Sequence, residues 1–258
     1  MDRTGEEFAI EERFCGPPRS GNGGYVCGRL AAFIDGPAAI RLKAPPPIGR
    51  ALGVERVEGG ARLLDGENVI AEGRSQALDL EVPPPPTLAE AERASQRFLG
   101  FVEHNFPACF VCGPERRAGD GLRIFPGALE EGARVDLGNG AGRADDPSGT
   151  LLAAPWTPDA SLAEASGRIC SEFIWAALDC PGAFTLYPLP QGVAVVLGEL
   201  ALEQVGPLEA GGRCILMAWP LGGEGRRRHA GTALFRADGS LVAKARAVWV
   251  EVPSQLWR

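Results

Sequence analysis

A strand-turn-strand unit that occurs twice, once in each half of the chain, constrains the fold most. Residues 61–83 (ARLLDGENVIAEGRSQALDLEVP) predict two strands around a turn at Asp65-Gly66, and residues 233–253 (ALFRADGSLVAKARAVWVEVP) repeat this plan around Asp238-Gly239. Asp-Gly between runs of β-forming residues is a strong hairpin signal. Both copies end in Glu-Val-Pro. We therefore interpret the chain as one module present twice, a fused pseudo-dimer whose halves can differ where they meet.

Composition narrows the functional classes. The chain has 258 residues, of which 45% are hydrophobic, enough for a packed core in one large domain or two smaller ones. A net charge of −7 without a basic cluster argues against nucleic-acid binding and favours a small-molecule partner. No apolar run reaches the roughly 18 residues of a membrane span, and the N-terminal sequence lacks the apolar centre of a secretory signal. We expect a cytoplasmic protein with no membrane partner, whose seven cysteines stay reduced.

Each half predicts one enclosed helix followed by an antiparallel meander. Residues 25–34 (YVCGRLAAFI) are apolar nearly all round, as in a helix that is covered on every side. Strands are predicted after it at 38–43, 51–57, 61–64 and 69–82. The second half repeats the order, with a helix at 169–179 and strands at 193–203, 212–219, 229–236 and 240–252. This order predicts sheets that wrap around helices.

Three further segments complete the organisation. Residues 8–15 predict a leading strand, residues 88–103 a helix after a proline-rich spacer, and residues 122–125 and 133–137 short strands. The predicted domains are an N-terminal one at 1–83, a linker with a helix at 84–106, and a C-terminal one at 107–258 that includes the Cys-rich leading segment.

Both halves contain short motifs near their predicted helices. Asn22-Gly23-Gly24-Tyr25, just before the first helix, resembles the His-Gly-Gly turn at which many hotdog-fold acyl-CoA thioesterases begin the central helix. The segment from Trp175 to Asp179 is similar to that of the phenylacetic-acid-pathway type, in which an acidic residue follows that turn. A third stretch, CFVCGP at 109–114 continuing to GLRIF at 121–125, resembles a Cys-x-x-Cys-Gly segment upstream of the hotdog core in some relatives.

The resemblance implies an α+β fold of the double-hotdog form, with two antiparallel sheets, each wrapped around a long central helix, packed as a pseudo-dimer. The chain departs from the pattern in two places. Asn22 stands where the usual histidine is, and the second helix begins with Cys170-Ser171-Glu172 in place of paired glycines.

Thioester hydrolysis needs a donor for the carbonyl oxygen and a carboxylate or base that attacks or activates water. Gly23 and Gly24 suit the first role, because free N–H groups at a helix start attract negative charge and glycine lets a ligand approach the backbone. Asn22 is placed to cap that helix. Asp179 is the expected carboxylate; the alternative is a helix-end residue that turns to solvent, just as a glycine-rich turn before a helix can be merely structural.

Aligning the two helices assigns the acid and the glycines to one corner. Tyr25 matches Phe173, so Gly24 falls opposite Glu172 in the alignment and Ala31 opposite Asp179. The resemblance implies antiparallel central helices, which would bring Gly24 to Asp179 and leave Glu172 beside Ala31 without a site. We expect one working site per chain. A rival alignment, which matches Asp35 to Asp179, makes both aspartates ordinary helix-stop residues.

Other residues are assigned to substrate binding. Tyr25, Glu172 and Trp175 are expected at the substrate site, although Glu172 also fits a charge that stabilises a helix start. Arg116 and Arg227 carry guanidinium groups suited to the phosphates of coenzyme A, or else lie on solvated turns. Cys109 and Cys112 have metal-like spacing, but no second CxxC or HxxxH completes a set of four ligands, so we predict no metal.

The sequence and the resemblance together predict a thioester hydrolase acting on a small-molecule acyl-CoA, with no cofactor beyond the coenzyme A thioester that is its substrate. A homodimer of double-hotdog chains is the assembly that the resemblance allows. The alternative is a noncatalytic acyl-CoA or fatty-acyl binding protein of the same fold. A hydratase fits less well, because neither His104 nor His229 lies near a helix acid in the sequence.

Overall fold

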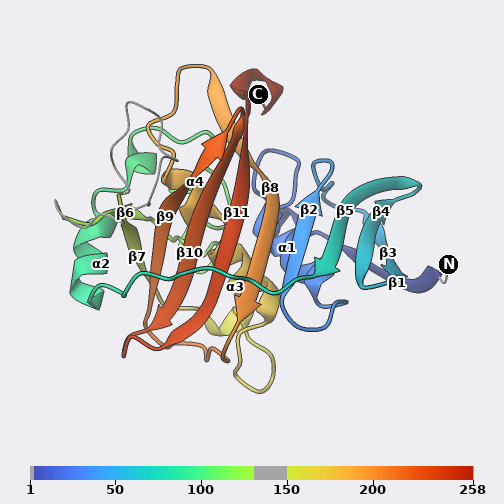
Figure 1. Ribbon diagram of the computed structural model, residues 1–258, viewed down its shortest axis with the longest axis horizontal. Helices are drawn as coiled ribbons and strands as arrows, with labels where there is room; N and C mark the ends of the chain where they lie inside the picture. Colours follow the sequence, from blue (N-terminus) through green and yellow to red (C-terminus); the bar gives the residue numbers. More distant parts are fainter. Residues whose placement is uncertain (1–2, 131–149, 258) are drawn as a thin grey trace.

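The computed structural model describes residues 3–130 and 150–257 (Figure 1). Within them, eleven strands form one antiparallel sheet in the order β1-β3-β4-β5-β2-β8-β11-β10-β9-β7-β6. The strands are β1 Arg3–Ala9, β2 Ala38–Leu42, β3 Ala51–Val57, β4 Gly60–Asp65, β5 Asn68–Ser75, β6 Gly127–Ala128, β7 Leu152–Trp156, β8 Val193–Gln204, β9 Cys214–Glu224, β10 Arg227–Arg236 and β11 Leu241–Pro253.

The helices are short. They are α1 Gly23–Ala31, α2 Leu88–Ser95, α3 Ser171–Ala177 and α4 Cys180–Phe184, with 3-10 turns at Glu12–Phe14, Leu99–Phe101, Ala160–Leu162 and Ser254–Trp257. No helix in the described parts of the chain is both long enough and apolar enough to span a lipid bilayer.

The predicted pair of separate sheets is corrected to one continuous sheet. The first half contributes β1 to β5 and the second β6 to β11, and β2 joins them by pairing with β8 from Ala38↔Leu202 to Arg41↔Glu199. Pairing removes an exposed edge from each half, where unpaired N–H and C=O groups would otherwise remain. The sequence pattern of each half shows where strands lie but not which strand edges pair with each other. It therefore could not predict the pairing of β2 with β8.

Both predicted hairpins are present. The β4–β5 turn has Gly66 at φ 62°, and the β10–β11 turn has Gly239 at φ 85°, the left-handed conformation for which glycine is suited. The second strand of the first copy is shorter than predicted and ends at Ser75. Beyond it, residues 76–87 leave the sheet and cross its outer face, where Leu78 packs against Ala39 and Ala201 (Figure 1).

The central helices begin and end differently from their predicted bounds. The first starts at Gly23, two residues earlier than expected, because Asn22 caps it, and it ends at Ala31. The second ends at Ala177, and the backbone at Asp179 (φ −78°, ψ −79°) breaks it from α4. Pro181 lies in the first turn of α4, where its missing N–H costs nothing.

Several smaller elements also differ. The predicted strand at 8–15 is the end of β1 followed by a 3-10 turn, and the predicted helix at 88–103 is α2 plus a separate 3-10 turn. Residues 122–125 form no strand. The strand predicted at 133–137 lies outside the described residues.

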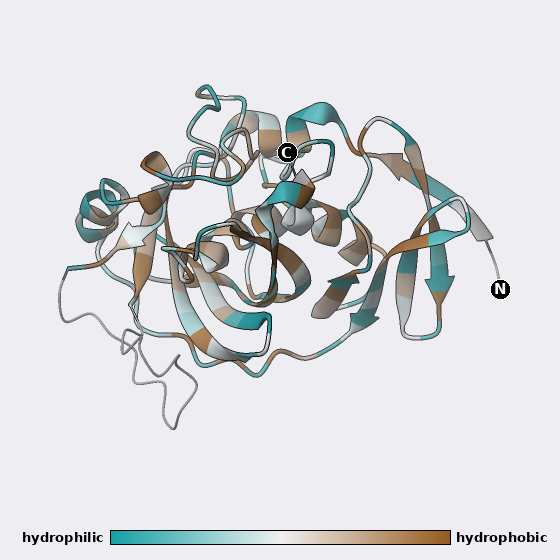
Figure 2. Cartoon of the chain, turned by 90° about the horizontal axis from the view of Figure 1, so that it is seen from above, coloured by the Kyte–Doolittle hydropathy of each residue, from teal (hydrophilic) through white to brown (hydrophobic). Residues whose placement is uncertain are grey.

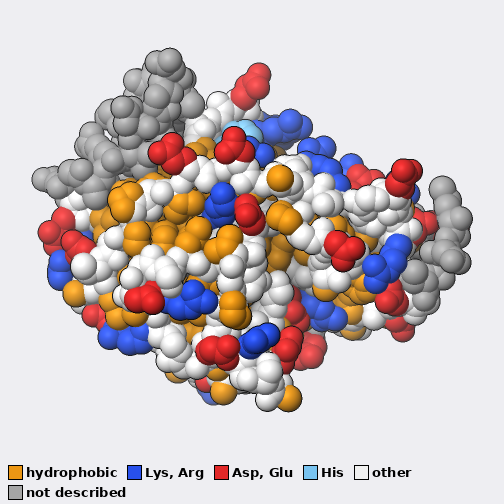
Figure 3. All heavy atoms as spheres, turned by 60° about the horizontal axis from the view of Figure 1, so that its bottom comes forward, with side chains coloured by type: hydrophobic (Ala, Val, Ile, Leu, Met, Phe, Trp, Pro, Cys, Tyr) orange, Lys and Arg blue, Asp and Glu red, His pale blue; other side chains and the backbone are white. Residues whose placement is uncertain are grey.

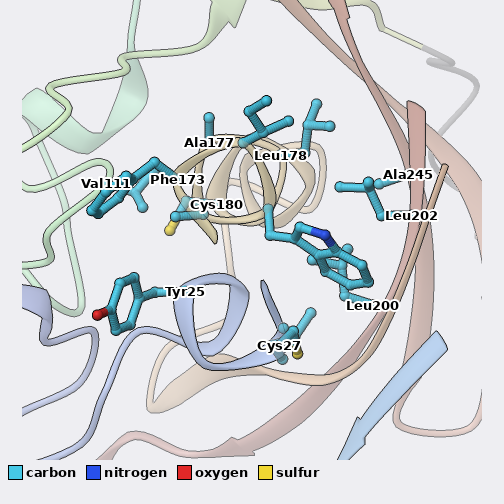
Figure 4. Close-up of a cluster of buried hydrophobic side chains, with 14 of the residues drawn as sticks. Tyr25, Cys27, Val111, Phe173, Ala177, Leu178, Cys180, Leu200, Leu202 and Ala245 are labelled. Atoms are coloured by element: carbon cyan, nitrogen blue, oxygen red, sulfur yellow. The ribbon is translucent and has the colours of Figure 1, made fainter. Parts of the chain in front are cut away.

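The molecule is layered. Seen from above, the 76–87 segment, the sheet and the helices follow one another in that order (Figure 2). Between the helices and the inner sheet face lies the main core, to which α1 contributes Cys27, α3 contributes Leu178 at its end, and β8 contributes Leu200 and Leu202 (Figure 4). Apolar side chains also gather on part of the surface, interspersed with charged ones (Figure 3). The core thus holds α1 and α3 together and fixes the corner where they meet.

Candidate functional site

The two central helices cross at glycines of α1. A methyl group on Gly24 would lie 2.5 Å from Asp179 Cβ and 2.6 Å from the Trp175 carbonyl oxygen. One turn later, a methyl group on Gly28 would lie 2.5 Å from Glu172 Cα. Since Gly24 meets the end of α3 and Gly28 its start, the helices run antiparallel. Only glycine allows backbones to approach this closely.

The expected contact between Gly24 and Asp179 is present. The Gly24 N–H donates to Asp179 Oδ2 at 2.8 Å, and Asn22 Nδ2 donates to the same oxygen at 3.0 Å. Asp179 is 2% exposed, so it is not the solvent-facing helix end of the alternative interpretation. The Asp35 carboxylate, its counterpart in the rival alignment, is exposed.

The side-chain amide of Asn22 forms hydrogen bonds through both its oxygen and its nitrogen. Its Oδ1 accepts from the Tyr25 N–H at 2.9 Å, which caps α1 as predicted, while its Nδ2 donates to Asp179. The helix cap therefore also orients the carboxylate. A histidine at this position would need a different geometry to do both.

In the first turn of α1, one N–H group has no acceptor within the described ranges. The Asn22 side chain accepts a hydrogen bond from the Tyr25 N–H, and the Asp179 carboxylate accepts one from the Gly24 N–H. The Gly23 N–H donates to no described residue. A side chain on Gly23 would collide with Leu197, 2.8 Å from the added methyl group. Gly24, expected to bind the substrate carbonyl, is thus already engaged, and Gly23 is the open donor.

The pKa of Asp179 is raised to about 7. Burial is the main cause, because it disfavours the charged carboxylate; the hydrogen bonds from Gly24 and Asn22 act in the opposite direction. Its second oxygen, Oδ1, is buried and has no hydrogen-bond partner among the described residues. One oxygen is therefore held in place and the other is available.

A cavity of about 300 Å³ opens beside this carboxylate. Its wall combines the turn before α1, the start of α4, the loop that carries Cys109 and Cys112, and strands β8 and β11, and most of it is apolar. Residues of this wall include Gly23, Asp179, Phe184, Leu197 and Trp249. Trp249 Nε1 is a second buried polar atom without a partner among the described residues.

Sequence reasoning missed the cysteine next to the acid. Cys180 Sγ lies 3.6 Å from Cys109 Sγ, and Asn22 Nδ2 lies 3.7 Å from Cys180 Sγ. Hydrogen bonds from the Cys112 and Cys180 thiols lower the pKa of Cys109. The CxxC spacing identified Cys109 and Cys112, but nothing local in the sequence links Cys180 to a loop about seventy residues earlier.

The other predicted binding residues lie outside the cavity wall. Tyr25 is buried against Phe14 and its hydroxyl accepts from Arg29, and Trp175 is buried on α3. Glu172 is partly exposed at the start of α3.

The two predicted phosphate ligands also lie elsewhere. Arg116 pairs with Asp120 at 2.9 Å and donates to the Ala108 carbonyl and to Cys15 Sγ, so its guanidinium is used within its own region. Arg227 is exposed on β10.

Comparison with solved structures identifies the fold. The chain superposes on a structure described as a thioesterase II from Thermobifida fusca with a TM-score of 0.60 and 17% identity, covering 97% of this chain and 94% of that one. The chain has the fold of the hotdog thioesterases.

Two further hotdog structures agree over nearly the whole length. A tesB protein from Mycobacterium avium subspecies paratuberculosis matches with a TM-score of 0.58 and 11% identity, covering 96% of this chain and 93% of that one. A structure described as a thioesterase from Novosphingobium aromaticivorans matches with a TM-score of 0.56 and 11% identity, covering 95% and 94%. The resemblance expected from the motifs is confirmed at the level of the fold. No family model matches this chain, and no curated protein matches it.

Proposed function

We propose that the protein is a thioester hydrolase acting on acyl-CoA, with Asp179 as its catalytic carboxylate. The observation that carries this proposal is a buried acid held by Gly24 and Asn22 through one oxygen, whose second oxygen has no partner in the described parts of the chain, on the wall of an apolar cavity. Keeping a carboxylate buried with half of its hydrogen-bonding capacity unused is costly unless a ligand or water uses the rest.

The proposed chemistry uses Asp179 Oδ1. As a base, it takes a proton from water while the water oxygen bonds to the thioester carbon; the C–S bond then breaks and the proton passes to the leaving thiolate. A carboxyl whose pKa is about 7 is well matched to proton transfer near neutral pH. The alternative is direct attack by the carboxylate, which forms an anhydride that water then hydrolyses.

The proposed donor to the carbonyl oxygen is the Gly23 N–H. It lies at the start of α1, where the helix dipole places partial positive charge, and it donates to no described residue. This assignment replaces Gly24, whose N–H already orients the acid. Trp249 Nε1 offers a second unpartnered donor on the same wall, suited to holding the attacking water.

The size of the cavity favours an acyl group as its occupant. About 300 Å³ with an apolar wall lies at the small end of ligand pockets, so the nucleotide part of coenzyme A would lie outside. We further propose that the chain works as a pseudo-dimer with one active corner, because Gly24 and Asp179 come from different halves.

The test is thiol release from a panel of acyl-CoA thioesters of increasing chain length. We expect wild-type protein to hydrolyse part of the panel and Asp179→Asn to lose activity by about a hundredfold or more, the range of a general base. Asp35→Asn, the other aspartate that follows a central helix, is the matched control and should retain full activity. Circular dichroism and melting curves establish that both variants fold.

Two results would contradict the proposal. Full activity in Asp179→Asn would remove the catalytic role from this carboxylate. Tight binding of acyl-CoA by wild type in calorimetry, without thiol release from any member of the panel, would instead support a noncatalytic binding protein. Label found in Asp179 after a single turnover in isotopically labelled water would establish the anhydride route, since the general-base route leaves both carboxylate oxygens in place.

A further inference from the structure

Three cysteines from two distant segments gather beside Asp179. Cys109 and Cys112 lie in the loop before β6, and Cys180 is the first residue of α4. Their sulfur atoms all lie within 4.8 Å of one another, and all three side chains are buried. They also share a wall of the cavity, so an ion can reach them from it.

The spacing of the sulfur atoms fits one tetrahedral metal ion. A Zn–S bond is about 2.3 Å, so two thiolates on one tetrahedral zinc lie about 3.8 Å apart. Cys109 Sγ and Cys180 Sγ are 3.6 Å apart, close to this value without any covalent link. Three protein ligands with a fourth, exchangeable position is the arrangement of zinc sites that bind a further ligand.

The surroundings support the ligand set. Asn22 Nδ2 lies 3.7 Å from Cys180 Sγ and 4.0 Å from Cys109 Sγ, where an N–H group stabilises thiolate charge. His104 Nδ1 accepts from the Phe106 N–H at 3.0 Å, so its neutral ring carries the proton on Nε2, which faces the Cys112 carbonyl at 3.2 Å. This histidine therefore braces the loop and does not compete as a ligand.

A disulfide or a purely packing role would explain fewer of the three clustered cysteines than a metal site does. A disulfide would use two of the three sulfur atoms and leave the third without a role. Packing alone does not require three polarisable thiols at one point on a cavity wall. A soft, thiophilic cation uses all three.

Because the structure adds Cys180 to the pair seen in the sequence, the prediction of no metal is replaced: we propose that Cys109, Cys112 and Cys180 bind one thiophilic metal ion, with Zn²⁺ the best fit, and leave one position for an exchangeable ligand. The site extends beyond the proposed hydrolysis, which uses Asp179 and needs no ion. Zn²⁺ and three thiolates together carry a net charge of −1, and the fourth coordination position would offer a ligand site to a thiol that enters the cavity.

Cobalt titration tests the site directly. Purified full-length protein, reduced with a phosphine and stripped of metal, is titrated with Co²⁺ and read by absorbance, then back-titrated with Zn²⁺. We expect one cobalt per chain, with sulfur-to-cobalt charge-transfer bands and tetrahedral visible bands that Zn²⁺ abolishes. Elemental analysis of the Zn²⁺-loaded protein supplies an independent stoichiometry.

Variants assign the ligands. Cys180→Ser and Cys112→Ser should each weaken the charge-transfer bands and cobalt uptake, whereas Cys214→Ser, which changes a buried cysteine outside the cluster, should match wild type. Melting curves without metal confirm that each variant is folded before titration. No cobalt uptake by wild type, or equal uptake and spectra in folded Cys180→Ser and Cys112→Ser, would overturn the proposal. Thiol release assayed on the same samples shows separately whether the proposed hydrolysis stands.

Discussion

The two ends of the α1–α3 crossing share a packing plan and differ in chemistry. At one end, Gly24 lies against Asp179, whose carboxylate is buried and lies on the wall of a cavity. At the other end, Gly28 lies against Glu172, which remains partly exposed. A pocket of about 260 Å³ lies near this second end, and the described residues of its wall include no acid, base or cysteine.

The difference shows what the proposed pseudo-dimer would permit. In a symmetric dimer, both corners would carry the same residues and both would have to satisfy catalysis and packing together. Here one corner keeps the glycine pair and the acid, whereas the other keeps only the close packing. Under the proposed function, the chain would use the Asp179 corner for chemistry and the Glu172 corner for stability.

The strongest test of the difference between the two ends of the α1–α3 crossing adds one methyl group at each end. Gly24→Ala and Gly28→Ala each place a Cβ 2.5 Å from an atom of α3 or of the residues that follow it. Overpacking of this kind costs about 1–3 kcal/mol, more than the ~1 kcal/mol that alanine gains within a helix. We expect both variants to lower the free energy of unfolding, measured by urea denaturation.

Activity should separate the two glycine variants. Gly24→Ala displaces Asp179 and the donor that orients it, so thiol release should fall at least tenfold, about 1.4 kcal/mol in barrier. Gly28→Ala should remain within a few-fold of wild type. Equal losses of activity in the two variants would mean that helix packing, and not the Asp179 corner, controls turnover.

A second comparison uses the two helix caps. Asn22 caps α1 and Thr87 caps α2, each through a side-chain oxygen. Asn22→Ala and Thr87→Ala should each cost about 1 kcal/mol of stability. Only Asn22→Ala also removes a donor from Asp179, and loss of a hydrogen bond to a charged group is worth about 1.5–3 kcal/mol, so thiol release should fall roughly ten- to a hundredfold. If Thr87→Ala reduced activity as much, capping alone would explain the effect.

The sequence and the family resemblance predicted the contact between Gly24 and Asp179 but not its hydrogen bonding. The alignment of the two helices and the antiparallel packing that the family resemblance implies were together enough to bring Gly24 to Asp179. They could not show that Asp179 lies in a break between α3 and α4, because that break depends on how Leu178 and Cys180 pack in the core. Nor could they show that the Asp179 carboxylate itself accepts from the Gly24 N–H, which leaves the Gly23 N–H without an acceptor among the residues that the structure describes.

Contacts between distant segments explain the remaining differences. Arg116 looked suited to a phosphate, but Asp120, Cys15 and the Ala108 carbonyl engage it. The cysteine cluster depends on a loop and a helix start that only the folded chain brings together. The joint between β2 and β8 likewise rests on edges that no local pattern specifies.

That joint offers a third, smaller test, away from both corners. Glu199 of β8 pairs with Arg41 of β2 at 2.9 Å and with Arg74 of β5 at 3.1 Å, so it connects the two halves. Burial alone raises the pKa of Glu199, but the hydrogen bonds and charges of Arg74 and Arg41 outweigh it and leave the pKa lowered. Because both arginines are about half exposed, we expect Glu199→Gln to cost no more than about 1 kcal/mol.

The pH dependence of this cost follows from the direction of the shift. A lowered folded pKa means that the stabilisation is fully present above the unfolded value of about 4.3 and disappears as pH falls through the folded pKa. Urea unfolding should therefore show a difference between wild type and Glu199→Gln at neutral pH that shrinks in acid. A difference that stays constant with pH would mean that the carboxylate charge does not hold this joint.

The smallest expected effect belongs to Glu172→Gln. This variant tests whether the end of the α1–α3 crossing opposite to Asp179 contributes to activity. The Glu172 carboxylate forms no hydrogen bond or ion pair with described residues, so its remaining role is to place negative charge in the first turn of α3. Such a charge is worth about 0.3–1 kcal/mol, and the short helix should give the lower value. We expect thiol release within about twofold of wild type, a change of less than 0.5 kcal/mol in barrier. A loss comparable to that of Asp179→Asn would show that both ends of the crossing take part in catalysis, because no packing change accompanies this isosteric replacement.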